Sequence, residues 1–127
     1  MEKKIVSSQN APAPIGPYNQ AVLFGNLLFI SGQIPLDAST GLMVNSDFQS
    51  ETKKVMENLE AILHEAGMTF DNVIKSTIFL TDMGKFSFVN EVYGSYFNNA
   101  TAPARETVQV SALPKGANVE ISMIAGK

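Results

Sequence analysis

The sequence contains no cysteine, and this absence excludes several kinds of chemistry. Disulfide bonds and thiolate catalysis are impossible, and any metal site would lack its commonest soft ligand. The chain also has a single histidine, His64, which argues against a histidine-built metal centre and against a Ser-His-Asp triad. We therefore expect no metal site.

Basic residues and long apolar runs are also scarce. Nine Lys and Arg residues stand against twelve Asp and Glu residues, giving a net charge of −3 and a pI near 5.0, which argues against a nucleic-acid partner. No apolar run approaches the roughly 18 to 20 residues that a membrane span requires. The first residues, Met1 to Ser7, lack the apolar core of a secretory signal. We expect a cytoplasmic protein that binds neither membrane nor nucleic acid.

The remaining composition is that of a folded globular protein. Hydrophobic residues make up 45% of the 127 positions and charged residues 17%. This length suffices for one domain to bury a core without covalent crosslinks. We expect a single domain spanning residues 1–127.

Hydrophobic periodicity predicts the order of the elements. Six runs rich in apolar and β-branched residues are typical of strands, at residues 4–7, 20–24, 27–32, 72–80, 102–110 and 119–125. Two amphipathic patterns predict helices, one capped by Ser46 or Asp47 and ending at Ala66, the other over residues 86–97. Gly25-Asn26 between two strands is a hairpin signal. The layout is α+β, with one sheet and two helices.

The proline-rich segment at residues 10–18 is expected to be a loop, because three prolines and a glycine disfavour helix and central strand. Its closing Tyr18 suggests an ordered loop that this side chain holds against the core. The strand at residues 27–32 is apolar throughout rather than alternating, which indicates that both its faces are covered. Two helices can cover only one face of a six-stranded sheet, so we expect the second face to be buried between subunits.

Two charged residues stand out in otherwise strand-like segments. Arg105 shares a side of its strand with Thr107 and Gln109, whereas Glu120 lies opposite the apolar side of the last strand. We expect these two strands to be neighbours. Arg105 could then form a structural ion pair with Glu120 or Glu106, or it could bind a carboxylated small molecule through its planar fork. The residue types alone do not decide between these alternatives.

Five segments together resemble the Rid family, the YjgF-type reactive-intermediate (imine and enamine) deaminases. They are Ile15-Gly16-Pro17-Tyr18, Ile30-Ser31-Gly32-Gln33-Ile34-Pro35, Phe88-Val89-Asn90, Pro103-Ala104-Arg105 and Val119-Glu120-Ile121. The resemblance runs through essentially the whole chain in order. It implies a chorismate-mutase-like α+β fold, a six-stranded mixed sheet with two helices on one face. It also implies a homotrimer with a central β-barrel and with sites in clefts between subunits.

The resemblance also implies an activity, the hydrolysis of 2-imino acids such as 2-iminobutanoate and 2-iminopropanoate to 2-oxo acids and ammonia. Arg105, with the backbone amide of Gly32, would bind the substrate carboxylate, and Glu120 would position water and move protons. Additional pocket residues would be Tyr18, Ser31 and Asn90. An iminium carbon is already electrophilic, so positioning and one proton shuttle suffice, and we expect no cofactor.

One position departs from the family pattern, since Thr107 stands where many imine-hydrolysing relatives carry cysteine. Its side chain shares the face of Arg105 and can still contact a ligand, but no thiol role survives. Structural interpretations also stay open for other positions, with Tyr18 as a loop anchor, Ser31-Gly32 as a bulge and Asn90 as a helix surface residue.

Two other functions are alternatives to hydrolysis. The first is a non-catalytic regulatory module that binds a small carboxylate. The second is endoribonuclease activity with inhibition of translation, an older label for relatives. The acidic pI and the absence of a histidine pair give this second alternative little support.

Overall fold

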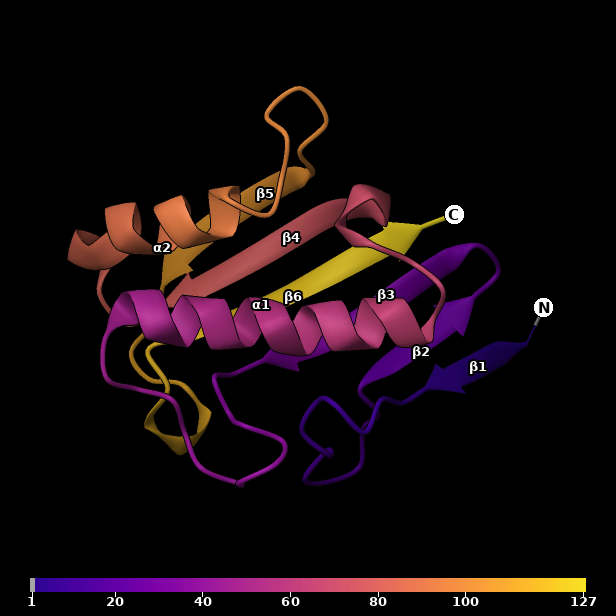
Figure 1. The fold of residues 1–127 in the computed structure, drawn as a ribbon, viewed down its shortest axis with the longest axis horizontal. Coiled ribbons are helices and arrows are strands. Elements are labelled where there is room, and N and C mark those ends of the chain that lie inside the picture. The colour runs from indigo at the N-terminus through magenta and orange to yellow at the C-terminus, as the bar shows by residue number, and fades with distance from the viewer. Residues whose placement is uncertain (1) are drawn as a thin grey trace.

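The computed structural model describes residues 2–127 and contains one mixed six-stranded sheet with two α-helices (Figure 1). The strands are β1 (Lys3–Val6), β2 (Ala21–Phe24), β3 (Leu27–Gln33), β4 (Val73–Leu80), β5 (Ala104–Gln109) and β6 (Val119–Gly126). Their order across the sheet is β1-β2-β3-β6-β4-β5, with β4 and β5 parallel and all other pairs antiparallel. The α+β layout predicted from the sequence is confirmed.

Both helices, α1 (Phe48–Glu65) and α2 (Phe86–Gly94), lie on one face of the sheet (Figure 1). The Asp47 side chain caps α1 by accepting the backbone N–H of Ser50 at 2.7 Å, and Gly67 follows the helix with φ +73°. These boundaries agree with the sequence prediction. No helix within residues 2–127 combines the length and the apolar character needed to cross a membrane.

Helix α2 ends at Gly94, earlier than the predicted end at residue 97. Tyr96 and Phe97 follow in a turn and pack edge-on against Phe70, with ring centroids 5.1 and 5.4 Å apart. These two aromatic residues keep a helix-like spacing in the sequence, but their burial is achieved outside the helix. The predicted helix therefore extends beyond the end of α2.

The core lies between the helices and the inner face of the sheet. On α1 the apolar stripe predicted from the sequence is buried, and facing strand residues are buried as well. These fully buried side chains include Val55, Leu59, Ile62, Leu28, Ile78 and Ile121. The inner face is thus the covered face of the sheet.

The proline-rich loop before β2 is ordered, and Gln20 more than Tyr18 holds it. Gln20 is 3% exposed, and its Oε1 accepts the Ser8 backbone N–H at 2.7 Å. Its Nε2 donates to three loop carbonyls, those of Ser8, Ala11 and Pro12. Tyr18 is 50% exposed and its hydroxyl accepts one loop N–H, that of Ile15, so Tyr18 is a minor anchor of the loop beside Gln20. A buried amide offers two N–H donors and a carbonyl acceptor to backbone groups, whereas a phenol offers a single donor.

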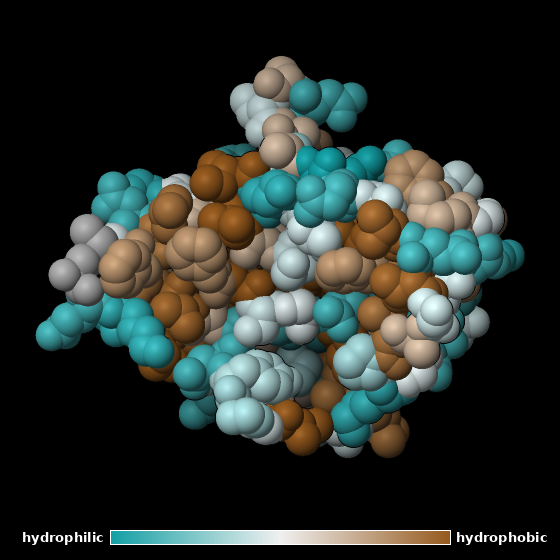
Figure 2. All heavy atoms as spheres, turned by 180° about the vertical axis from the view of Figure 1, so that it is seen from behind, coloured by the Kyte–Doolittle hydropathy of each residue, from teal (hydrophilic) through white to brown (hydrophobic). Residues whose placement is uncertain are grey.

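The outer face of the sheet, turned away from both helices, is open within one chain (Figure 2). On β3, Leu28 and Ile30 are buried under the helices, whereas Leu27 and Phe29 are 39% and 43% exposed. Hydrophobic side chains gather on this face over the N-terminal strands, as Figure 2 shows. Exposed members of this apolar patch are Ile5, Phe24, Leu27 and Phe29. The sequence-based expectation that both faces of β3 are covered is therefore not met by a single chain.

Candidate functional site

Arg105 projects from β5 toward α2, on the inner side of the sheet. Its Nη1 donates to Asn90 Oδ1 at 2.7 Å. The guanidinium carbon lies 5.1 Å from the ring centroid of Tyr93 and 5.5 Å from that of Phe86, within cation–π range. One amide and two aromatic rings thus fix the orientation of the guanidinium.

No carboxylate within residues 2–127 pairs with Arg105. Glu106 projects to the outer face, where its carboxylate lies 3.1 Å from Lys75 Nζ and accepts a hydrogen bond from the Thr77 hydroxyl. These two partners, led by the Thr77 hydroxyl, hold the pKa of Glu106 below its ordinary value. The structural alternative, in which Arg105 pairs with Glu106 or Glu120, is wrong for this chain.

Thr107 follows Arg105 on the same side of β5, opposite Ile78 of β4. Its Oγ1 is buried and has no hydrogen-bond partner among residues 2–127. The predicted shared face of Arg105 and Thr107 is confirmed. A hollow of about 400 Å³ lies beside Arg105, and its lining residues are Asn90, Tyr93, Gly94, Phe97, Asn99, Ala102, Pro103 and Arg105.

Glu120 lies on the outer face of β6, between Val119 and Ile121, which are buried on the inner face. Its carboxylate lies over Gly32 of β3, so closely that a Cβ added to Gly32 would come within 2.8 Å of Glu120 Cδ. A side chain at position 32 would force the Glu120 carboxylate to move from this place. Burial raises the pKa of Glu120, because the surrounding protein disfavours its charged form.

Ser31 and Gly32 form a β-bulge, since they together face Ser122 between the pairs Ile30–Met123 and Gln33–Ile121. The Ser31 hydroxyl donates to the Asn19 carbonyl at 2.6 Å, which leaves only its oxygen lone pairs for another partner. The structural interpretation of this dipeptide as a bulge is therefore correct. The bulge thus interrupts the β3–β6 hydrogen-bond ladder at Gly32, the residue over which the Glu120 carboxylate lies.

A cleft of about 360 Å³ opens next to the bulge. Tyr18 and Gly32 line it together with the loops before β2, after β3 and before β6. The full lining is Pro12, Ala13, Ile15, Tyr18, Gln20, Gly32, Gln33, Ile34, Leu36, Pro114 and Lys115. The Tyr18 hydroxyl accepts the backbone N–H of Ile15 at 3.3 Å.

Sequence reasoning missed Lys115 in this cleft. Its backbone is left-handed, with φ +56°, the only non-glycine residue of residues 2–127 in that region. Such a conformation costs of order 1 kcal/mol and often occurs at functional sites. Lysine, unlike glycine or asparagine, has no preference for left-handed backbone, so the residue types of the Pro114-Lys115-Gly116 turn give no signal of this conformation.

The predicted site residues thus fall into two groups. We call Arg105, Asn90 and Thr107 the arginine group, and Glu120, Gly32, Ser31 and Tyr18 the glutamate group. Strand β4 lies between β5 and β6, so the expectation that the Arg105 and Glu120 strands are neighbours is wrong. The β4-α2-β5 unit is a parallel crossover, which puts β5 next to β4 at the edge of the sheet.

Comparison with known proteins shows the family of the chain. Residues 8–127 match the family described as Endoribonuclease L-PSP. The chain belongs to this family. The resemblance to the Rid, or YjgF-type, proteins found in the sequence is thereby confirmed.

Individual members of the L-PSP family carry different names. The chain is 54% identical to "Protein DfrA" from Myxococcus xanthus, over 98% of this chain and 96% of that protein. It is 47% identical to the 2-iminobutanoate/2-iminopropanoate deaminase of Mus musculus, over 97% of this chain and 90% of that protein. Among solved structures it is similar to E. coli TdcF with bound serine, with a TM-score of 0.91, 42% identity and 98% coverage of both chains.

Proposed function

We propose that this protein hydrolyses reactive 2-imino acids, such as 2-iminobutanoate and 2-iminopropanoate, to 2-oxo acids and ammonia. The observation that carries the proposal is the unpaired guanidinium of Arg105, oriented by Asn90 and two aromatic rings. The deaminase name of the mouse relative and the serine bound to the E. coli relative support the same substrate class, a small molecule with an α-carboxylate.

Arg105 binds the substrate carboxylate in this proposal. A guanidinium fork matches a carboxylate with two parallel N–H bonds. The hydrogen bond to Asn90 uses only Nη1 of Arg105, so the other N–H donors remain for the substrate. Because the side chain is already held against Tyr93 and Phe86, binding costs little additional conformational entropy. The Gly32 amide assists Arg105 at the carboxylate, and the side chains of the glutamate group then contact the reacting end of the substrate.

Glu120 handles water and protons. On the iminium form of the substrate, the ionised Glu120 carboxylate removes a proton from water as the oxygen attacks the C=N carbon, and the C=N π electrons move to nitrogen to give a neutral carbinolamine. Glu120 then gives this proton to the nitrogen. The hydroxyl oxygen forms the C=O bond as the C–N bond breaks, the hydroxyl proton passes back to the Glu120 carboxylate, and ammonia leaves and takes up that proton as ammonium. Burial raises the pKa of Glu120, which brings it closer to the operating pH as a general acid and base requires.

A complete site requires two subunits, since the sheet separates the arginine group from the glutamate group within one chain. We propose a homotrimer in which the outer faces of the sheets pack into a central barrel and the arginine group of one subunit meets the glutamate group of its neighbour. The exposed apolar patch supports this assembly, because a monomer rarely leaves such a patch in water.

A coupled assay tests the proposed activity. A threonine dehydratase supplies the four-carbon imine, and addition of this protein is expected to accelerate release of 2-oxobutanoate and ammonia. Glu120→Gln is expected to lower the catalysed rate by roughly 10² to 10⁴-fold, the usual contribution of acid–base catalysis. Unchanged kinetics with the wild-type protein would contradict the proposal. Binding of a 2-oxo acid without any rate effect would favour the non-catalytic alternative.

A further inference from the structure

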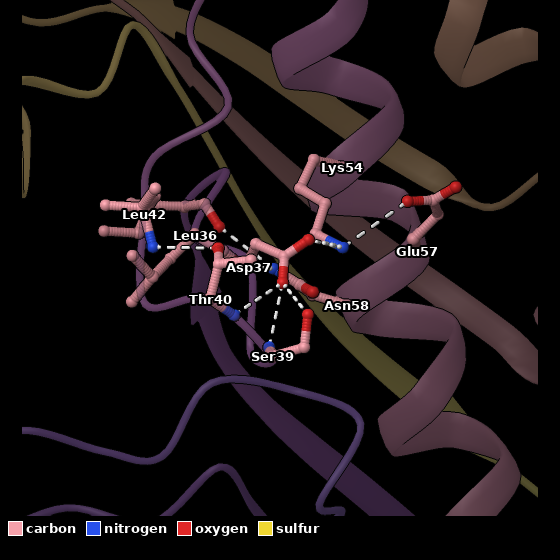
Figure 3. Close-up of polar contacts among 9 residues, drawn as sticks. Leu36, Asp37, Ser39, Thr40, Leu42, Lys54, Glu57 and Asn58 are labelled. Atoms are coloured by element: carbon pink, nitrogen blue, oxygen red, sulfur yellow. Dashed lines mark hydrogen bonds and ion pairs between the residues drawn. The ribbon is translucent and has the colours of Figure 1, made fainter.

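One buried side chain of α1 holds the segment that follows β3. Asn58 is 1% exposed, and its Nδ2 donates to the Ile34 carbonyl at 3.1 Å and to the Leu36 carbonyl at 3.0 Å (Figure 3). One amide group thus fixes two alternate carbonyls of an irregular segment more than twenty residues away in the sequence.

The two carbonyls also determine how the Asn58 amide is oriented. Only its NH₂ group can donate to them, so its Oδ1 must point away, and Oδ1 is buried without a partner among residues 2–127. A buried acceptor without a partner costs about 1 to 3 kcal/mol. An apolar residue would avoid this cost but would also remove the donor from the Ile34 and Leu36 carbonyls, so what the asparagine provides here is the pair of hydrogen bonds that fixes the Ile34–Leu36 segment.

A second contact with α1 holds the continuation of the same segment (Figure 3). Lys54 Nζ lies 3.2 Å from Asp37 Oδ2, while Asp37 Oδ1 accepts the backbone N–H groups of Ser39 and Thr40 at 2.8 and 3.1 Å. Leu36 also forms an isolated bridge with Met43. The segment therefore has little freedom to move away from the helix.

The fixed segment is one wall of the cleft that contains Tyr18 and Gly32. Ile34 and Leu36 both line the cleft, and Ile15 and Pro114 are further apolar lining residues. A substrate whose reacting carbon lies beside Gly32 would direct its own side chain toward these apolar walls. A displaced wall changes the space available to that side chain.

We propose that Asn58 is a positioning residue, and that the Ile34–Leu36 wall which it holds selects 2-imino acids by the length of an apolar side chain. This inference rests on the proposed function. A hydrophobic pocket discriminates about 10 to 200-fold for one methylene group, so a misplaced wall is expected to have an effect of that order.

The test compares two imines that differ in side-chain length, 2-iminobutanoate and 2-imino-4-methylpentanoate, each formed in place from its amino acid by an amino-acid oxidase. The kcat/KM ratio of the two is measured for wild type, Asn58→Leu and Leu36→Ala. Asn72→Leu is the matched control, since Asn72 Nδ2 also donates to a distant carbonyl, that of Gly126 at 3.1 Å, but lines no part of the cleft.

Asn58→Leu is expected to change the ratio about tenfold, chiefly through KM, and Leu36→Ala to shift it toward the longer imine. Asn72→Leu is expected to leave it unchanged. If Asn58→Leu and Leu36→Ala both keep the wild-type kcat/KM ratio, the inference is overturned. If Asn58→Leu does not fold, the ratio of Leu36→Ala alone decides. If the wild type hydrolyses neither imine, the proposed function fails.

In that case, calorimetric Kd values for the two matching 2-oxo acids test the role of the Ile34–Leu36 wall. An unchanged Kd ratio in Asn58→Leu and Leu36→Ala would overturn that role.

Discussion

Arg105 and Glu120 lie on opposite faces of one sheet. Arg105 is in register with Ser76, whose hydroxyl accepts a hydrogen bond from Tyr93 beneath α2 at 2.9 Å. Glu120 is in register with Phe79 on the outer face, one strand further into the sheet. The sheet itself therefore separates the two charges within one chain, and this separation is the reason for proposing a site shared by two chains.

Thr107→Val is expected to stabilise the protein by about 1 kcal/mol, because it replaces a buried hydroxyl without a partner by a methyl group of similar size. Urea denaturation at one fixed protein concentration measures the change. Thr77→Val is the matched control. The Thr77 hydroxyl donates to Glu106, so the same substitution is expected to destabilise. Equal effects at both positions would show that the Thr107 hydroxyl is satisfied.

Glu120→Gln is expected to raise stability more at neutral pH than at pH 4. Burial raises the pKa of Glu120 in the folded state above its ordinary value of 4.5, so the folded protein holds this proton more tightly than the unfolded chain. The wild type therefore loses stability as the pH rises from about 4.5 through the raised pKa, and the variant does not. Melting temperatures of both proteins between pH 4 and 8 test this, and a difference that is independent of pH would contradict it.

Asp37→Asn is expected to loosen the loop after β3. Hydrogen bonds from Ser39 and Thr40 hold the pKa of Asp37 well below its ordinary value of 3.8, so the carboxylate contributes stability above that pH and loses it as the pH falls through the lowered pKa. Faster hydrogen exchange of the Ser39 and Thr40 amides is the expected result. Asp71→Asn is the control, because the Asp71 carboxylate makes no hydrogen bond within residues 2–127. Unchanged exchange in Asp37→Asn would contradict the assignment.

Phe29→Lys is expected to dissociate the proposed oligomer. Phe29 is 43% exposed within the apolar patch, and a buried ammonium without a partner would cost several kcal/mol in the assembly. Leu42→Lys provides the control, since Leu42 is 68% exposed on the loop after β3 and away from the sheet. Light scattering coupled to gel filtration measures the mass. A monomeric wild type, or an unchanged mass in Phe29→Lys, would contradict the proposal.

The sequence predicted local structure well where one signal dominated. The Asp47 cap, the Gly67 end of α1 and the Gly25-Asn26 hairpin all follow from single residues with strong conformational preferences. The order of the strands was less accessible, because alternation assigns the faces of a strand but not its neighbours. The strand-helix-strand pattern of β4-α2-β5 favours a parallel crossover with β5 beside β4, but it does not say which strand lies on the other side of β4.

The candidate site was predictable only in part, for the same reason. Arg105 and Glu120 were recognisable as charges in apolar strands, but their separation by the sheet depends on strand order. Gln20, Asn58 and Lys115 carry no periodic signal. Their roles arise from contacts between segments far apart in the sequence, or from a single backbone angle.

Mixed oligomers test the shared site most directly. Arg105→Ala and Glu120→Ala are each expected to be inactive alone. When the two variants are unfolded together and reassembled at equal amounts, one site in about four combines an intact Arg105 with an intact Glu120 from different chains, as expected for a closed ring of identical interfaces. Imine hydrolysis should then recover to about a quarter of the wild-type rate. Mixed oligomers that form but stay inactive would contradict a site shared between subunits.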